Sequence, residues 1–456
     1  MSGNLDFGKA PLGLLLRKQA LPASIGILVM SVYGIIDTIF VGRYVGSLGI
    51  GAITVVMPIT FLISSIGMAI GIGGSSIISR SFGENMPEKA RAVFGNQIVL
   101  SLALAFVFVL VGWFFQDGVL KTFGGKGDIL EPAIEYFRIV LIGVPFLAWA
   151  MMSNTVIRAE GHPRIAMFTM IVPAITNLIL DPLFIVVFDM GIAGAAWATT
   201  ISYAASAIFT AYFFVFGPSN MNLTWDCLRP QKSIIKEVSS LGSVTLARQG
   251  TISVLAIVLN NSLYSFGGEL SLAAYGIVSR LLMFVNFPVL GISQGFVPIV
   301  GFNFGAKKLE RVSDVTRLAL NAATLIAGFL FLGVMIFTHP LASLFSNDPA
   351  LLERAVPAIR MVFLATPLLA TSLMGSAFFQ AIGQARLAMI LALSKQGFLL
   401  VPLILILPHF FGIEGIWFSF PLADIGAAII SVRQLAKTPY VQMPWQKNKP
   451  SAQTQA

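Results

Sequence analysis

The sequence is poor in charged residues, cysteine and histidine, and each shortage argues against a class of protein. Only 11% of the 456 residues are charged, whereas soluble domains carry about 25%. The single cysteine, Cys227, excludes an intramolecular disulfide and argues against a cysteine-built metal site. The three histidines lack the spacing of metal ligands. No nucleophile lies beside a base as in covalent catalysis, so we expect no enzyme.

Long apolar runs are abundant instead. Hydrophobic residues make up 56% of the chain, and a run of about 20 of them crosses a bilayer as a helix. The runs predict an all-α integral membrane protein with twelve transmembrane helices. Their approximate limits are 18–42, 52–80, 93–115, 132–156, 165–187, 191–216, 236–264, 273–302, 314–337, 354–380, 387–410 and 413–435.

Basic residues are distributed unevenly between the loops. Most of the 29 Lys and Arg residues fall in segments on one side of the predicted membrane, whereas the opposite side holds Arg43, Lys121, Lys126 and Arg354. Such an excess marks the cytoplasmic side. We therefore expect a multi-pass protein of a prokaryotic inner membrane with both termini in the cytoplasm. The same distribution explains the net charge of +9 without a nucleic-acid partner.

The two halves of the chain repeat each other at a constant offset of 222 positions. The offset relates Ser81-Phe82-Gly83 to Asn303-Phe304-Gly305, and Arg158-Ala159-Glu160-Gly161 to Gln380-Ala381-Ile382-Gly383. A constant offset over several loops indicates duplication. Each unit has six spans, so the two lobes form a parallel repeat about the membrane normal, with pseudo-symmetry between them.

The longest polar stretch inside the chain predicts where the lobes are joined. We expect an N-lobe of six helices over residues 1–216, a cytoplasmic linker over 217–235, a C-lobe of six helices over 236–437, and a cytoplasmic tail over 438–456.

Two carboxylates lie well inside the spans of the first half, Asp37 and Asp181. The positions 222 residues further on are Leu259 and Leu403, so the second half lacks both acids. Acids inside a membrane are costly and usually functional. The alternative is that both acids only bond neighbouring backbone near helix ends. We favour an acidic functional site that duplication did not preserve.

Neighbouring polar residues extend this candidate site. Asn177 lies four residues before Asp181 and therefore on the same helical face. Thr199, about two turns into the next span, is expected to join them. Two carboxylates with amide and hydroxyl oxygens suit a proton or a hard cation. We expect no cofactor apart from Na⁺ as a candidate bound ion at Asp37, Asn177, Asp181 and Thr199.

The second half has three ionisable candidates of its own. Arg248 and Asp424 are both near the middle of their spans and are expected to pair with each other. Lys395, about two turns into its span, is expected to extend toward the cytoplasmic surface.

At these residues the chain resembles the multidrug and toxic compound extrusion (MATE) family, on its DinF-like branch. The resemblance covers all twelve spans. It depends on Pro22 with Gly34-Ile35-Ile36-Asp37, on Arg158-Ala159-Glu160-Gly161, on Asn177 with Leu180-Asp181-Pro182, and on Val297-Pro298 before Asn303-Phe304-Gly305.

The resemblance implies a V-shaped antiporter that exports small cationic, lipophilic compounds in exchange for H⁺ or Na⁺ by alternating access, and we expect it to act as a monomer. It implies an ion site at Asp37, Asn177, Asp181 and Thr199, associated polar positions at Tyr136 and Asn154, and a helix bend at Pro22. Tyr136 and Asn154 are 18 positions apart, about 27 Å along a straight helix, so both cannot contact one ion.

A flippase for a lipid or lipid-linked precursor is the alternative function on this architecture. An anionic headgroup favours a more cationic cavity, and Arg248 and Lys395 keep that alternative open.

Overall fold

The computed structural model describes residues 6–442, apart from the side chain of Ser47, and is almost entirely helical. Ten of its helices are long and apolar enough to cross a membrane. The longest, α8, joins two helices at Gly268, and α11 with α12 forms one further bent span. Counting these separately gives the twelve predicted spans. No strand occurs within the described ranges, so the predicted fold class is confirmed.

The chain divides into two compact units, which differ from the predicted lobes at their edges. Unit 1 contains Ile25–Gly242 and unit 2 contains Asp6–Ser24 and Ser243 onward. The first part of α1 therefore belongs to unit 2, while the first part of α8 and the whole predicted linker belong to unit 1. Most of the predicted tail, from residue 443, lies outside the described residues.

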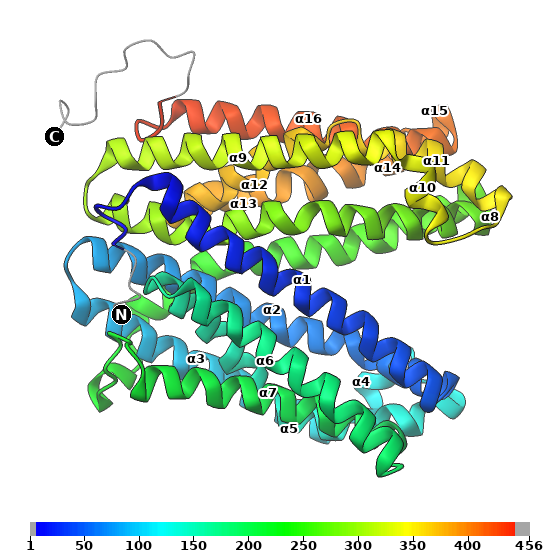
Figure 1. Cartoon of the computed structure of the whole chain (residues 1–456), viewed down its shortest axis with the longest axis horizontal. Coiled ribbons are helices and arrows are strands. Elements are labelled where there is room, and N and C mark those ends of the chain that lie inside the picture. The colour runs from blue at the N-terminus through cyan, green and yellow to red at the C-terminus, as the bar shows by residue number, and fades with distance from the viewer. Residues whose placement is uncertain (1–5, 443–456) are drawn as a thin grey trace. The chain divides into compact units, whose positions relative to one another are not determined.

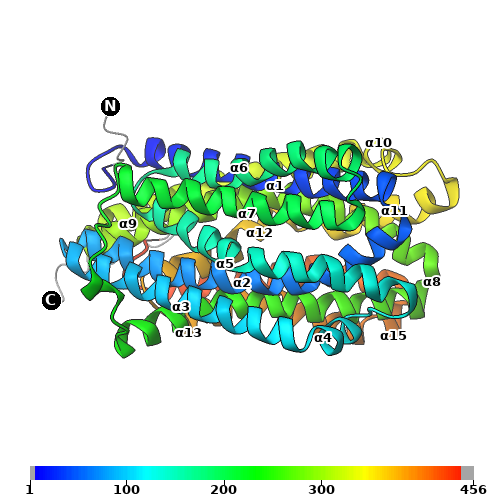
Figure 2. The ribbon, with the colours of Figure 1, turned by 90° about the horizontal axis from the view of Figure 1, so that it is seen from below.

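The helices of unit 1 run roughly along a common direction (Figures 1 and 2). They are α1 (Leu12–Tyr44, shared with unit 2), α2 (Ser47–Gly83), α3 (Pro87–Phe114), α4 (Gln116–Thr122), η1 (Gly127–Ile129), α5 (Leu130–Ala159), α6 (Pro163–Asp181), the π-helix η2 (Pro182–Val187), α7 (Gly191–Phe216) and η3 (Trp225–Leu228).

Unit 2 contains the remaining helices. They are α8 (Lys232–Gly305, shared with unit 1), α9 (Leu309–Ile336), α10 (Thr338–Ser343), α11 (Pro349–Phe363), α12 (Thr366–Ala381), α13 (Ala385–Leu393), the π-helix η4 (Ser394–Leu400), α14 (Val401–Ile406), α15 (Pro408–Phe411) and α16 (Ile413–Lys437).

Backbone geometry repeats between the units at the same offset as the sequence. Gly46 and Gly268 turn the chain at φ 90° and 67°: Gly46 lies between α1 and α2, and Gly268 lies at the kink that divides α8. Gly161 and Gly383 have φ 86° and 85°, and Asn85 and Lys307 have φ 56° and 57°. Residues at positive φ are uncommon, so three matched pairs at an offset of 222 support duplication independently of side-chain identity.

The predicted linker is fixed to unit 1 at several points. The buried Glu160 carboxylate accepts hydrogen bonds from Ser219 Oγ at 2.9 Å and from the Asn220 backbone N–H at 2.7 Å. Further along, Asn96 donates to the Arg229 carbonyl at 3.2 Å and accepts from the Gln231 N–H at 2.6 Å. The segment between α7 and α8 is therefore part of the packed unit.

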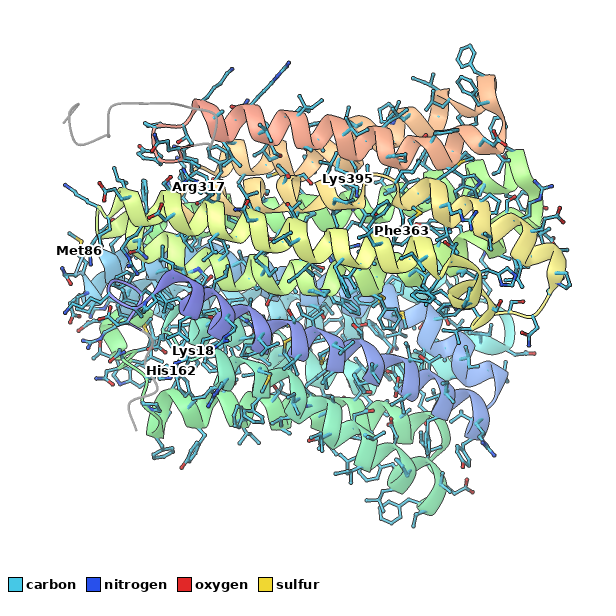
Figure 3. All side chains as sticks on the ribbon, turned by 45° about the horizontal axis from the view of Figure 1, so that its top comes forward. Lys18, Met86, His162, Arg317, Phe363 and Lys395 are labelled. Carbon is cyan, nitrogen blue, oxygen red and sulfur yellow. The ribbon has the colours of Figure 1, made fainter. Side chains whose placement is uncertain are left out.

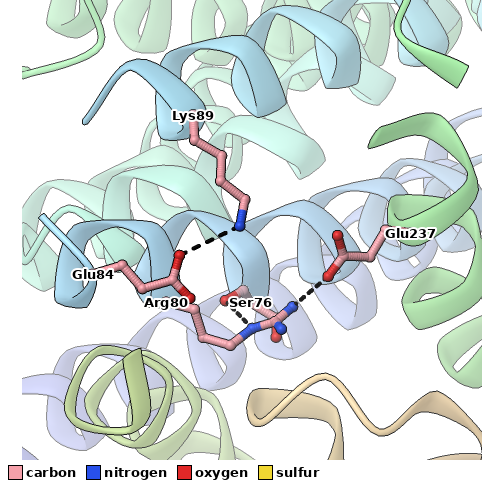
Figure 4. Close-up of polar contacts among 5 residues, drawn as sticks. All are labelled: Ser76, Arg80, Glu84, Lys89 and Glu237. Carbon is pink, nitrogen blue, oxygen red and sulfur yellow. Dashed lines mark hydrogen bonds and ion pairs between the residues drawn. The ribbon is translucent and has the colours of Figure 1, made fainter. Parts of the chain in front are cut away.

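The first part of α8 is also attached to unit 1. Arg80 on α2 forms an ion pair with Glu237 at 2.8 Å, and its Nε also donates to the Ser76 carbonyl (Figure 4). A Cβ on Gly73 would collide with the backbone of Val238. Because Gly73 has no side chain, α2 and the start of α8 pack with their backbones close together.

Candidate functional site

Asp37 on α1 and Asp181 at the end of α6 are brought together inside unit 1. Their carboxyl groups lie within hydrogen-bonding range of each other. Asp181 is 2% exposed, and Asp37 is partly buried with its Oδ1 fully covered. The structure thus places the two acids, 144 positions apart in sequence, at one point.

The position of Asp181 follows from the proline after it. Pro182 has no N–H and cannot continue the α-helical hydrogen-bond pattern. The helix continues beyond Asp181 as the π-helix η2, and π-turns inside helices are frequent at functional sites. Asp181 therefore lies at a change of helix type, where the side chains are directed differently from those of a regular helix.

Two of the other predicted residues, Asn177 and Tyr136, lie near the acids, and a third, Thr199, lies beside Tyr136. Asn177 is fully buried and lies within reach of the Asp181 carboxyl. Thr199 on α7 is 5% exposed and lies within hydrogen-bonding range of Tyr136 on α5. Tyr136 in turn lies within electrostatic range of both acids. Four helices, α1, α5, α6 and α7, therefore contribute side chains to the acidic site.

Several polar atoms of the acidic site have no hydrogen-bond partner among residues 6–442. They are Oδ1 of Asp37, Oδ1 of Asp181, and both amide atoms of Asn177. Buried polar atoms are normally paired, and exceptions frequently mark an ion, a proton or water. Over the same residues no group of three or more His, Cys, Asp or Glu is arranged to hold a metal. The acidic site therefore contains carboxylate and amide atoms that no residue among 6–442 pairs.

Two tyrosines of the site were missed by the sequence analysis. The first is Tyr33, which lies close enough to Asp37, Asp181, Tyr136 and Tyr203 to interact with them electrostatically. The second is Tyr203, which lies similarly close to Asp37. Tyr33 precedes Asp37 by four positions and Tyr203 follows Thr199 by four. This i, i+4 spacing shares a helix face and was the signal that would have identified both.

Asn154 and Pro22 lie elsewhere. Asn154 donates to the Ala166 carbonyl at 2.6 Å and to Thr169 Oγ1 at 2.7 Å, and it accepts from Arg158 at 3.1 Å. It links α5 to α6 rather than contacting the acids. Pro22 lies inside α1, which is continuous from Leu12 to Tyr44, on the part of α1 that belongs to unit 2.

The ionisable residues of unit 2 pair differently from our prediction. Lys395 Nζ lies 2.6 Å from Asp424 Oδ1, so the predicted pairing of Arg248 with Asp424 is wrong. Lys395 does not extend to a surface either, since its side chain is 19% exposed and lies within the helices of unit 2 (Figure 3). The reason is that η4, which carries Lys395, packs directly on α16, which carries Asp424.

Comparisons with known proteins agree with this architecture. The family model described as MatE matches residues 22–183 and 246–406. A curated relative, the multidrug export protein MepA of Staphylococcus aureus, is 28% identical over 426 residues, which cover 93% of this chain and 94% of that protein.

Solved structures show the same fold. One is described as the outward-facing conformation of a multidrug resistance MATE family transporter of the MOP superfamily. It has a TM-score of 0.89 and 26% identity, and the match covers 95% of this chain and 97% of that one. Another, MATE in the bent conformation, has a TM-score of 0.90 and 26% identity over 95% and 96% of the two chains.

Proposed function

Because the chain belongs to the MatE family of membrane transporters, we propose that it is a multidrug efflux antiporter driven by inward flow of H⁺ or Na⁺. The acid pair of Asp37 and Asp181 carries this proposal. Two carboxyl groups within hydrogen-bonding range, buried among four helices, can share one proton or hold one cation between them. The coupling ion is then a transported substrate and not a resident cofactor.

The acids connect ion binding to export through their charge. When both are ionised, the site attracts a cationic lipophilic compound, and Tyr33, Tyr136 and Tyr203 lie near the acids. When a proton or Na⁺ occupies the site from outside, that attraction is lost and the compound leaves. The ion drives the cycle only through its different affinity for the outward-open and inward-open states.

The remaining parts of the proposal concern topology. Both termini lie in the cytoplasm, the protein acts as a monomer, and the two six-helix lobes open alternately to either side of the inner membrane. Helix α1 moves at Pro22, as expected for the DinF-like branch. The acids in the first half and the leucines at Leu259 and Leu403 in the second support that branch. The flippase alternative gains no support, since the curated relatives are named as multidrug exporters.

A flux assay in vesicles tests the proposal. The purified protein is reconstituted into vesicles, and the vesicles are loaded with ethidium. A pH gradient or a sodium gradient is then imposed across their membrane in separate experiments. We expect export with one gradient and none without any gradient. The gradient that works identifies the coupling ion. If the folded protein exports neither ethidium nor other cationic dyes under either gradient, the antiporter proposal is refuted.

A further inference from the structure

The segment Asp6–Ala10, which we call the N-terminal strap, precedes α1 and is folded against unit 2. Asp6 Oδ1 accepts hydrogen bonds from the backbone N–H groups of Gly8 at 2.9 Å and Lys9 at 3.1 Å, which closes a turn. The Phe7 side chain is 3% exposed, and its ring lies 5.8 Å from that of Phe302 at the end of α8. The strap is thus an ordered, partly buried piece of chain.

Three side chains, from the end of α8, the turn after it and the start of α9, hold the strap by its backbone carbonyls. Arg311 donates to the carbonyls of Phe7 at 3.1 Å and Ala10 at 2.8 Å. Asn303 also donates to Phe7, at 3.0 Å, and Lys308 donates to Gly8 at 2.9 Å. We call Asn303, Lys308 and Arg311 the strap holders.

The holders form a built arrangement. Arg311 Nε donates to Asn303 Oδ1 at 3.0 Å, which orients the Asn303 amide toward the strap. Asn303 is fully buried. A Cβ on Gly8 would lie 3.0 Å from Lys308 Nζ and 3.1 Å from the Phe302 ring, so glycine permits this close approach. Charged donors form stronger hydrogen bonds than neutral ones, and two of the three holders are charged.

The strap leads directly into α1, whose first part is packed on unit 2. A Cβ on Gly291 would collide with Ser24, and one on Gly295 would collide with Gln19 and Ala20. The same helix then continues into unit 1, where it carries Asp37. One continuous helix therefore has its start fixed in unit 2 and its acidic residue in unit 1.

We propose that Asn303, Lys308 and Arg311 are positioning residues for transport: they hold the start of α1 in unit 2, so that α1 transmits motion of that unit to Asp37. This inference rests on the proposed antiporter function. Without the holders, the start of α1 follows unit 2 less closely, and ion binding at the acidic site is no longer connected to the movement of the lobes. Substrate binding itself is left intact, because the holders touch neither acid.

A matched pair of variants on α9 tests the inference. Arg311→Gln removes the contacts to Phe7 and Ala10. Arg317→Gln removes the same charge from the same helix, but Arg317, labelled in Figure 3, donates to the Gln442 carbonyl at 2.7 Å instead of to the strap. Each full-length variant is reconstituted and assayed for ethidium transport, and hydrogen exchange is followed by mass spectrometry over residues 6–24 and 25–44.

We expect Arg311→Gln to raise exchange over residues 6–24 by at least about tenfold, because several hydrogen bonds are lost together. We expect a change over residues 25–44 as well. The kcat should fall at least about fivefold while KM stays within about twofold, as for loss of an interaction that acts after binding. Arg311→Lys, which keeps the charge and one donor group, should recover part of the rate.

Lys308→Gln, which removes one contact, serves as a milder variant in case Arg311→Gln does not fold. It should give a smaller effect in the same direction, whereas Arg317→Gln should match the wild type. The inference is overturned if exchange rises only within residues 6–11 and kcat is unchanged. Wild-type protein that transports nothing under either gradient would refute the antiporter proposal. The exchange comparison of Arg311→Gln with Arg317→Gln would still decide whether the holders position α1.

Discussion

The two units carry acidic side chains and apolar side chains, respectively, at equivalent helical positions. Asp37 and Asp181 form the acidic site of unit 1, whereas Leu259 and Leu403, 222 positions later, belong to the apolar packing of unit 2. Leu259 is fully buried. An apolar side chain is therefore compatible with the fold at these positions. The acids of unit 1 are not required for packing, and this is why we assign them a function.

The reverse comparison concerns the buried charges of unit 2. Lys395 and Asp424 neutralise each other at 2.6 Å, and the equivalent residues of unit 1 are Pro173 and Ser202. In unit 1, by contrast, no Lys, Arg or His within residues 6–442 forms an ion pair with Asp37 or Asp181. Unit 2 contains a buried ion pair, whereas the two carboxyl groups of unit 1 have no cationic partner among residues 6–442.

The largest expected effect is loss of transport on removing either acid. Asp37→Asn and Asp181→Asn should each lower gradient-driven efflux by at least about a hundredfold, because a neutral amide neither attracts the cation nor exchanges a proton. Efflux rates at matched protein amounts measure this. Glu131→Gln, which removes an exposed acid of α5, is the control. Normal efflux from both variants would rule out the assigned ion site.

The next effect is on the stability of unit 2. Asp424→Asn leaves the Lys395 ammonium buried without its counter-charge and should destabilise the protein by about 3–5 kcal/mol. Replacing both, with Lys395→Met and Asp424→Leu, should be close to neutral. Unfolding equilibria in mixed micelles measure the difference. If Asp424→Asn changed stability by less than about 1 kcal/mol, Lys395 and Asp424 would behave as an exposed ion pair and not as a buried one.

A smaller, pH-dependent effect is expected at Glu160, which lies between α5 and α6 outside the spans. Burial raises its pKa from 4.5 to about 7, although Asn220 and Ser219 donate hydrogen bonds to it. Unfolding therefore releases its proton between pH 4.5 and 7, and stability falls with rising pH over that window by up to about 3 kcal/mol. Thermal unfolding at pH 5 and pH 7.5 should show a weaker decline for Glu160→Gln. An identical decline would contradict the assignment.

The smallest effect is expected where an ion pair is partly exposed. The side chain of Glu237 is 43% exposed in its pair with Arg80, and such pairs contribute about 0–1 kcal/mol. Glu237→Gln should therefore change stability far less than Asp424→Asn when both are compared in the same micelles. A loss equal to that of Asp424→Asn would mean that exposure does not explain the difference between the two pairs.

The sequence was informative where a signal lies along one helix or in one repeat. Span positions, the duplication and the grouping of Asn177 with Asp181 all follow from spacing. Pairing across helices was harder, because periodicity identifies the face of a helix but not the helix it meets. Asp424 was therefore paired with Arg248 instead of Lys395. The π-helix η4, which carries Lys395, has no signal in a periodicity of 3.6 residues.

Basic residues of the loops were also interpreted too narrowly. Lys308 and Arg311 belong to the excess of basic residues from which the cytoplasmic side was predicted. The structure shows that both also hold the backbone of the N-terminal strap. One residue can do both, and only the second role depends on tertiary contacts. Composition alone could not reveal it.

The first part of α1 belongs to unit 2 and the first part of α8 belongs to unit 1. This arrangement has a consequence for splitting the protein into two separately expressed halves. Residues 1–216, expressed as a separate polypeptide, would contain the strap without Asn303, Lys308 and Arg311, and would expose the surface near Gly73 on which Val238 packs. The other half would lack Gln19, Ala20 and Ser24, which pack against Gly291 and Gly295. A tandem duplication thus became a protein whose halves no longer fold from separate stretches of sequence, so a split transporter would have to be cut elsewhere than at the repeat boundary.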